Sequence, residues 1–261
     1  MLRAALNRVS RLKASLKMLR SPSPSSPPQV SSDYVVLRAD EAESEGARLR
    51  DAWLHEDLPT RQRALVDSQL ALYRAGNTVD VFDTFVAALR SLPVLRDGAS
   101  LLEIGCSSGY YAEVLRVAGL PLRYTGCDYS EAFIALARQI YPGIPFAVED
   151  AAALSYETDG FDIVVSGCCL LHIPDYERAI AETARVARDF VIFHRTPLML
   201  GAPTKHFRKR AYGIETVEIQ FGEAEFLALM AHHGLVPLTS LSLSETPETA
   251  IRTYVCRKRR P

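Results

Sequence analysis

The residues best suited to bind a charged ligand lie at 103–109 (EIGCSSG), and a second acidic residue, Asp128, ends the next apolar run. The apolar residues before the turn can form a strand, and those from Tyr111 onward have helical spacing. Gly105 and Gly109 can adopt backbone angles and close approaches that a side chain would block. The pattern therefore predicts a strand, turn and helix in which a ligand contacts bare backbone at the helix N-terminus.

Two classes of cofactor use such a turn. A dinucleotide dehydrogenase requires G-x-G-x-x-G, with a pyrophosphate on the helix dipole. This chain has G-x-x-x-G, and Ser107 stands where the middle glycine would be. Glu103, just before the turn, places a negative charge that suits a cationic ligand better than a pyrophosphate. These features favour S-adenosylmethionine, which carries a sulfonium and an ammonium, and leave a nicotinamide-dependent reductase as an alternative.

At these residues the chain resembles the class I S-adenosylmethionine-dependent methyltransferases, specifically the small-molecule, type 11-like branch. Their first motif has the form E/D-x-G-x-G-x-G, and further blocks follow here in the family's order: LRYTGCD at 122–128, EDA at 149–151 and GCCLLHIPD at 167–175. The resemblance implies that an acid binds the ribose hydroxyls, a tyrosine packs on adenine and a second acid accepts from the adenine amino group. The cofactor-binding residues that it implies are Glu103, Gly105, Cys106, Ser107, Gly109, Asp128 (ribose), Tyr129 (adenine), Asp150 (adenine amino group), Ala151 and Gly167.

The expected fold class is α/β, with a doubly wound, Rossmann-like sheet of seven strands that ends in an antiparallel strand. The methyltransferase domain is expected over 96–261, and helical periodicity predicts an N-terminal helical cap over 33–95. Residues 196–221 show little periodicity and many basic and aromatic groups, which is typical of a substrate-facing insertion. The last two strands are expected at 235–243 and 251–256.

The N-terminal region has a different composition. Residues 1–20 place leucines and a valine along one helical stripe and contain six Lys or Arg and no acid, which predicts a basic amphipathic helix. A Pro/Ser-rich linker at 21–32 follows it. The helix could dock on its own protein or a partner, lie on a membrane surface, or act as a targeting segment. No run of 18 apolar residues is present, and we expect a cytoplasmic protein, with membrane association on the cytoplasmic face as one option.

Candidate catalytic residues follow two of the expected strands. Methyl transfer needs in-line placement of a nucleophile and often removal of its proton, and histidine is the natural base near neutral pH. His172 lies just beyond the fourth strand and His194 at the end of the fifth, although each could instead order its own loop. Arg195 is a cation that could hold a substrate carboxylate or phosphate. By analogy with the family, Tyr73 and Arg74 in the cap are also candidate substrate-binding residues.

The cysteine spacing and the charge limit the classes of function that the chain can have. The five cysteines show no C-x-x-C pairing, so we expect no metal site and a reducing compartment. The body of the chain is acidic, which argues against a nucleic-acid partner. We expect a methyltransferase that acts on a small-molecule, sugar or lipid-linked acceptor, with oxygen as the acceptor atom. A catalytically silent S-adenosylmethionine-binding regulatory module is the alternative, and the degenerate Ser107 favours it.

Overall fold

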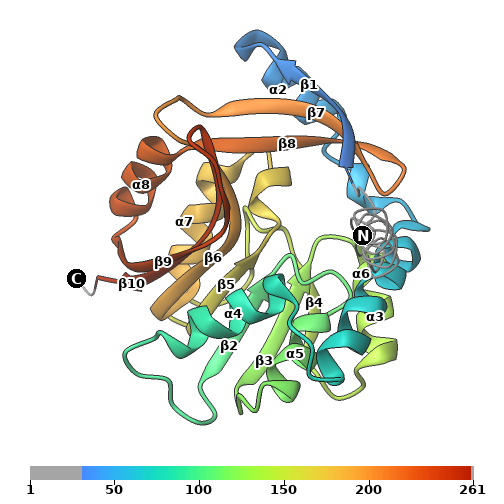
Figure 1. The fold of residues 1–261 in the computed structure, drawn as a ribbon, viewed down its shortest axis with the longest axis vertical. Coiled ribbons are helices and arrows are strands. Elements are labelled where there is room, and N and C mark those ends of the chain that lie inside the picture. The colour runs from blue at the N-terminus through green and yellow to red at the C-terminus, as the bar shows by residue number, and fades with distance from the viewer. Residues whose placement is uncertain (1–30, 260–261) are drawn as a thin grey trace, which may run out of the picture. The chain divides into compact units, whose positions relative to one another are not determined.

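A mixed sheet forms the centre of residues 31–259, the part of the chain that this computed structural model describes (Figure 1). Five parallel strands run in the spatial order β4, β3, β2, β5, β6, and β10 pairs antiparallel with β6 and then with β9. This confirms the Rossmann-like sheet with its antiparallel strand. The strands are β2 (Ser100–Ile104), β3 (Arg123–Asp128), β4 (Phe146–Val148), β5 (Phe161–Gly167), β6 (Ala187–Met199), β9 (Leu235–Glu245) and β10 (Thr249–Lys258).

Helices cover both faces of this sheet. On one face, α4 (Asp80–Arg90), α5 (Tyr110–Val117) and α6 (Glu131–Ile140) bury apolar side chains against β2, β5 and β6. On the other face, α7 (Tyr176–Val186) and α8 (Glu223–His232) pack on the same strands. Because burial on both faces leaves only the strand ends open, a ligand site belongs at the carboxyl ends of the parallel strands.

A second, antiparallel arrangement extends the sheet beyond the expected seven strands. It consists of β1 (Ser31–Leu37), β7 (Lys205–Ala211) and β8 (Ile214–Gly222), and β8 joins the end of β6 through the pairs Leu198 with Phe221 and Met199 with Gly222. The sequence analysis predicted no strands over 196–221 and so missed β7 and β8. Within the expected helical cap over 33–95 it also missed the strand β1, although helices do form most of that segment.

The missed strands have a physical explanation. On the buried face of β7 and β8, Lys209 and Glu218 form an ion pair and are only 5% and 7% exposed. In β7 a buried charge stands where a half-buried strand would have an apolar residue, so that strand lacks the expected alternation. In β8 the residues 216–221 (TVEIQF) do alternate polar and apolar, and the sequence analysis missed this signal.

The cap contains α2 (Ala39–Arg48), the 3₁₀ turn η1 (Ala52–Leu54) and α3 (Leu58–Arg74). Its packing joins three parts of the fold, because Leu58 of α3 forms a buried cluster with Phe133 of α6 and Ile214 of β8. The cap and the β7–β8 hairpin thus meet beside the cofactor-binding strands. No helix within residues 31–259 is long and apolar enough to cross a membrane. The predicted amphipathic helix at 1–20 lies outside the described residues.

Candidate functional site

Three residues that are not glycine adopt left-handed backbone angles at the carboxyl ends of adjacent parallel strands. Ser107 after β2, Cys168 after β5 and Arg195, the residue after the last pair of β6 with β5, have φ of 52°, 63° and 60°. Such conformations are rare for these residue types and persist only where the surrounding structure holds them. Their clustering marks this edge of the sheet as the candidate site.

The turn after β2 is fixed by the acid that ends β3. The backbone N–H groups of Ser107 and Ser130 donate to the two carboxylate oxygens of Asp128 at 2.9 and 3.0 Å. Burial raises the pKa of this carboxyl to about 6, although both backbone hydrogen bonds favour the charged form. Asp128 therefore lies at the strand end where the family resemblance implies a ribose contact.

Glu103 is a buried carboxylate that makes no ion pair within residues 31–259. It is 1% exposed, accepts a hydrogen bond from the hydroxyl of Tyr124, and has its pKa raised to about 8 by burial. Its carboxylate faces Gly167, where a side chain would place its Cβ 2.5 Å from Glu103 Oε1. Gly167 therefore leaves room for the acid, and the acid is available for a cationic ligand.

The two glycines of the turn are required by packing inside the protein. A Cβ at Gly105 would lie 2.3 Å from the Cβ of Cys169, and a Cβ at Gly109 would lie 2.5 Å from the ring of Phe146. The sequence analysis expected the space beside each glycine to be open to a ligand. In the structure a side chain of the protein fills that space. Cys106 between them is fully buried. The predicted cofactor contacts of these three residues stay predictions.

The cap covers the side predicted to hold adenine. Tyr129 donates its hydroxyl proton to the carbonyl oxygen of Arg50 at 3.1 Å, and the backbone N–H of Trp53 donates to the Tyr129 hydroxyl oxygen at 3.2 Å. Asp150 forms an exposed ion pair with Arg50 at 3.2 Å, and Ala151 adjoins it. The sequence analysis missed Arg50, because one arginine in a polar segment carries no pattern.

Gln62 of α3 is another residue that the sequence analysis missed. Its side-chain oxygen accepts a hydrogen bond from the Ser107 hydroxyl, and the next residue, Arg63, donates to the Ser108 hydroxyl at 3.4 Å. The cap therefore contacts the cofactor turn directly. No sequence signal could have shown this, because the contact joins segments 45 residues apart.

His172 lies in the 3₁₀ turn η2 (Leu170–His172) directly after β5. Its Nδ1 lies 2.6 Å from the carbonyl oxygen of Val217, and its ring lies against the indole of Trp53, with ring centroids 4.6 Å apart. Burial lowers its pKa to about 4. Because a carbonyl only accepts, Nδ1 carries the proton and Nε2 presents a lone pair. His172 can therefore accept a proton or orient a hydroxyl.

His194 has a different environment. It is 2% exposed, its Nε2 lies 2.8 Å from the hydroxyl of Tyr111, and its Nδ1 lies 2.9 Å from the hydroxyl of Thr253. Burial lowers its pKa well below the usual value. Both ring nitrogens are occupied, so this geometry fits a residue that holds β6, β10 and α5 together and does not favour the predicted catalytic role.

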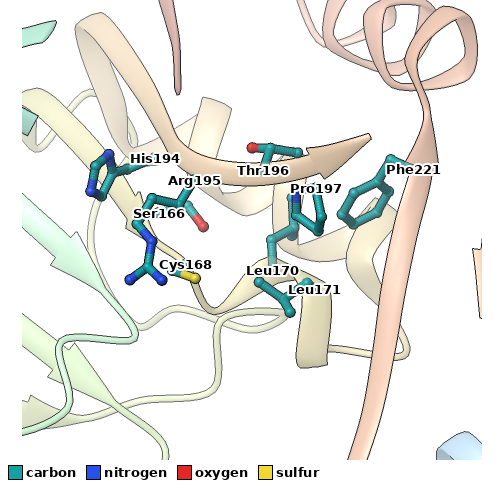
Figure 2. Close-up of a pocket in the computed structure, with 9 residues that line it drawn as sticks. All are labelled: Ser166, Cys168, Leu170, Leu171, His194, Arg195, Thr196, Pro197 and Phe221. Atoms are coloured by element: carbon teal, nitrogen blue, oxygen red, sulfur yellow. The ribbon is translucent and has the colours of Figure 1, made fainter. Parts of the chain in front are cut away.

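A narrow cavity opens where β5, η2 and β6 meet. Figure 2 shows the side chain of Arg195 directed toward the sulfur of Cys168. The Nε of Arg195 is buried and has no hydrogen-bond partner among residues 31–259. The lining residues are Ser166, Cys168, Leu170, Leu171, His194, Arg195, Thr196, Pro197 and Phe221.

The two substrate-binding candidates in the cap lie elsewhere. Arg74, which is partly exposed, pairs with the buried Glu113 of α5 at 2.7 Å, and Tyr73 packs edge-on against Phe82. Both belong to the last turn of α3, and neither lines the cavity. The substrate role predicted for Tyr73 and Arg74 is therefore not supported by their positions. Within residues 31–259, no group of three His, Cys, Asp or Glu side chains is arranged to hold a metal ion.

Comparison with known proteins agrees with this geometry. Residues 102–193 match the family model described as "Methyltransferase domain". These residues form a class I S-adenosylmethionine-dependent methyltransferase domain. The match begins within β2 and ends within β6, so it covers the cofactor turn, Asp128 and the loop that carries His172.

One similar curated protein is the phthiotriol/phenolphthiotriol dimycocerosates methyltransferase of Mycobacterium leprae. It is 34% identical over 93 residues, which make up 35% of this chain and 34% of that protein. The chain thus spans about a third of the length of the curated relatives that it matches.

Two solved structures show the same fold. The 1,6-didemethyltoxoflavin-N1-methyltransferase of Burkholderia thailandensis, with bound 1,6-didemethyltoxoflavin and S-adenosylhomocysteine, is 16% identical, covers 87% of this chain and 93% of its own, and has a TM-score of 0.53. The magnesium protoporphyrin IX methyltransferase of Synechocystis is 18% identical, covers 68% and 82%, and has a TM-score of 0.51. At these identities the likeness concerns the fold alone.

The donor set of the site fits S-adenosylmethionine. Asp128 presents a carboxylate at the end of β3, as a pair of ribose hydroxyls requires, and Glu103 is a buried acid with no cationic partner in the described chain. The orphaned Nε of Arg195 offers a donor to an anionic group. When bound, the cofactor supplies a methyl group on a sulfonium that is already activated for transfer.

Proposed function

We propose that this protein transfers the methyl group of S-adenosylmethionine to an oxygen atom of a small-molecule, sugar or lipid-linked acceptor. The observation that carries the proposal is His172, which follows β5 at the ligand edge of the sheet and keeps Nε2 free of any hydrogen bond within the described chain. The names of the relatives support this acceptor class, since one acts on phthiotriol dimycocerosates and another on 1,6-didemethyltoxoflavin.

The protein's part in the reaction is to position groups and to accept a proton. The indole of Trp53 packs against the His172 imidazole, and the Val217 carbonyl oxygen accepts the proton of its Nδ1. Nε2 can therefore accept a hydrogen bond from a hydroxyl of the methyl acceptor. A hydroxyl proton becomes far more acidic as its oxygen gains a methyl group. An imidazole with a pKa of about 4 is therefore a sufficient base, and it stays neutral at physiological pH.

The experiment pairs a binding measurement with a turnover measurement. Calorimetric titration with S-adenosylhomocysteine tests the cofactor, and transfer of a labelled methyl group to a panel of hydroxylated sugars, polyketide-like alcohols and lipid-linked alcohols tests the reaction. We expect binding and methylation of an oxygen. Binding without turnover on any acceptor would favour the silent regulatory module, and a labelled nitrogen in the product would disprove oxygen as the acceptor atom.

The first twenty residues add a separate proposal, that they attach the protein to anionic membrane surfaces. The support is their composition: an apolar stripe of leucines and a valine, together with six basic residues and no acid. Full-length protein should float with anionic vesicles at low salt and detach at high salt, since screening weakens surface charges. A protein that begins at Ser31 should stay unbound, and equal flotation of the two proteins would contradict the proposal.

A further inference from the structure

Trp53, the only tryptophan of the chain, contacts two parts of the candidate site. Its backbone N–H donates to the hydroxyl oxygen of Tyr129 at 3.2 Å, on the side predicted to hold adenine. Its indole Nε1–H donates to the hydroxyl oxygen of Thr216 in β8 at 3.0 Å, and its ring lies against the imidazole of His172. This residue of η1 therefore joins the predicted adenine side to the histidine proposed as the base.

Two consecutive residues of β8 hold the indole and the imidazole. Thr216 accepts the indole proton, and the carbonyl oxygen of Val217 accepts the proton on Nδ1 of His172 at 2.6 Å. Both strand residues are buried, and both pair with β7. Because adjacent residues of a paired strand have fixed relative positions, the two rings are also fixed, with centroids 4.6 Å apart and planes inclined by 46°.

The tip of the β7–β8 hairpin packs on the same indole. Tyr212 and Gly213 have φ of 50° and 83°, and a two-residue hairpin turn with positive φ at both positions matches the twist of its strands. The carbonyl oxygen of Tyr212 accepts from the guanidinium of Arg61 at 3.2 Å, and the Tyr212 ring meets the indole edge-on with centroids 6.2 Å apart. The hairpin tip and η2 therefore both limit the movement of the indole.

Burial is the largest cause that lowers the pKa of His172, to about 4. Of the charged groups that act on the imidazole, Lys209 of β7 lowers this pKa and Glu218 of β8 raises it, and the two side chains form a buried ion pair with each other. Withdrawal from water disfavours the charged imidazolium, so apolar surface against the ring keeps it neutral. The indole of Trp53 supplies such surface, because it lies in contact with the ring.

We propose that Trp53 is a positioning residue for the methyl transfer: its indole fixes the orientation of the His172 ring and excludes water from it, so that Nε2 stays available to the acceptor hydroxyl. The inference rests on the proposed function, because it takes His172 as the base. A side chain that only fills space would affect stability and leave the titration of His172 unchanged. The contact with Tyr129 comes from the backbone of Trp53, so a substitution of the side chain should preserve cofactor binding.

The test follows His172 directly. Proton–carbon NMR of the full-length protein labelled with ¹³C-histidine gives the titration of each of the six imidazoles, and the spectrum of His172→Ala identifies the signal of His172. In wild-type protein this signal should not titrate from about pH 8 to 5.5, since the pKa is about 4. In Trp53→Leu it should titrate with a midpoint above about 5, because water then reaches the ring and favours the imidazolium.

Further variants distinguish positioning from packing. Trp53→Phe keeps an aromatic ring against the imidazole and should hold the pKa of His172 below about 5. Tyr156→Leu is the matched control, because its partly buried ring packs edge-on against Phe161 at the opposite end of β5, and its loss should leave the titration of His172 unchanged. Thermal unfolding checks that each variant is folded. Trp53→Met, which fills more of the space, replaces Trp53→Leu if that variant does not fold.

Turnover gives a second measurement once an acceptor is found. Trp53→Leu should lower turnover about tenfold to a hundredfold, because a displaced base no longer meets the acceptor hydroxyl in the right geometry. Its affinity for S-adenosylhomocysteine, measured by calorimetry, should change less than about threefold, because the base takes no part in cofactor binding.

The outcomes separate this inference from the proposed function. If the signal of His172 in folded Trp53→Leu titrates as in wild-type protein, or if Tyr156→Leu shifts it equally, Trp53 does not position the base. If His172 of wild-type protein titrates near the ordinary pKa of histidine, the inference also fails. If the titrations are as expected and no labelled methyl group reaches an oxygen atom, the indole controls this imidazole and only the proposed function fails.

Discussion

The Nδ1 atom of His172 lies 2.6 Å from the carbonyl oxygen of Val217, and this contact joins the loop after β5 to the added strand β8. It determines which ring nitrogen carries the proton, because a carbonyl oxygen cannot donate. The accessory strands therefore orient the one histidine in the described site whose second nitrogen has no protein partner.

Replacement of this histidine should impair turnover and spare cofactor binding. His172→Ala should lower turnover 10²–10⁴-fold, the usual contribution of a general base, while affinity for S-adenosylhomocysteine changes less than twofold. Labelled methyl transfer and calorimetry on the same preparation measure the two quantities. His232→Ala, on the exposed end of α8, is the matched control and should behave as wild type. Near-normal turnover of His172→Ala would disprove the role.

The pH dependence of turnover follows from the same residue. Burial lowers the pKa of His172 to about 4, so the imidazole is neutral and able to accept a proton at every pH well above that value. Its contribution to turnover should thus be constant from pH 6 to 8 and decline only as the pH falls toward 4. A turnover profile at saturating cofactor that already declines between pH 7 and 6 would show that this pKa does not govern the reaction.

Loss of the Tyr111 hydroxyl should affect stability. Tyr111→Phe leaves Nε2 of the buried His194 without its partner at 2.8 Å, which should lower the free energy of unfolding by about 1–3 kcal/mol. Urea denaturation followed by circular dichroism measures the change, and Tyr176→Phe, whose half-buried ring packs on Phe221, serves as the control. A loss below about 0.5 kcal/mol would mean that the hydrogen bond contributes little.

Asp128 should control cofactor affinity. We expect Asp128 to accept hydrogen bonds from the two ribose hydroxyls, so affinity of Asp128→Ala for S-adenosylhomocysteine should fall at least tenfold. The control is Asp162→Ala at the opposite end of the sheet, where the carboxylate accepts from Ser100 N–H at 2.8 Å. That variant should retain wild-type affinity. Unchanged binding in Asp128→Ala would overturn the ribose assignment.

Cofactor affinity should increase with pH through the titration of Glu103. Burial raises the pKa of this acid to about 8, so the free protein holds it protonated below that pH. A bound ammonium favours the ionised form, so binding releases a proton, and affinity should fall as the pH falls from 8.5 to 6.5. Calorimetry across this range measures the slope. Glu103→Gln should remove it, and a slope retained in that variant would assign it to another group.

The sequence alone determined the cofactor half of the molecule. The turn at 103–109, the acid Asp128 and the strand β5 are local patterns in which a short apolar run is followed by glycines or a carboxylate. Because each pattern positions a ligand group within a few residues of its own strand, order and spacing were enough to predict the fold and the cofactor.

Only the tertiary structure showed the accessory strands and the surroundings of His194 and Arg195. Lys209, buried in an ion pair with Glu218, hid β7 from periodicity. Tyr111 and Thr253, far from His194 in the sequence, occupy both of its ring nitrogens. The φ of 60° at Arg195 likewise follows from its packed surroundings, not from its residue type. Which side of the sheet a polar side chain faces, and what it contacts there, depends on segments that the chain brings together over long separations, and no local pattern records such contacts.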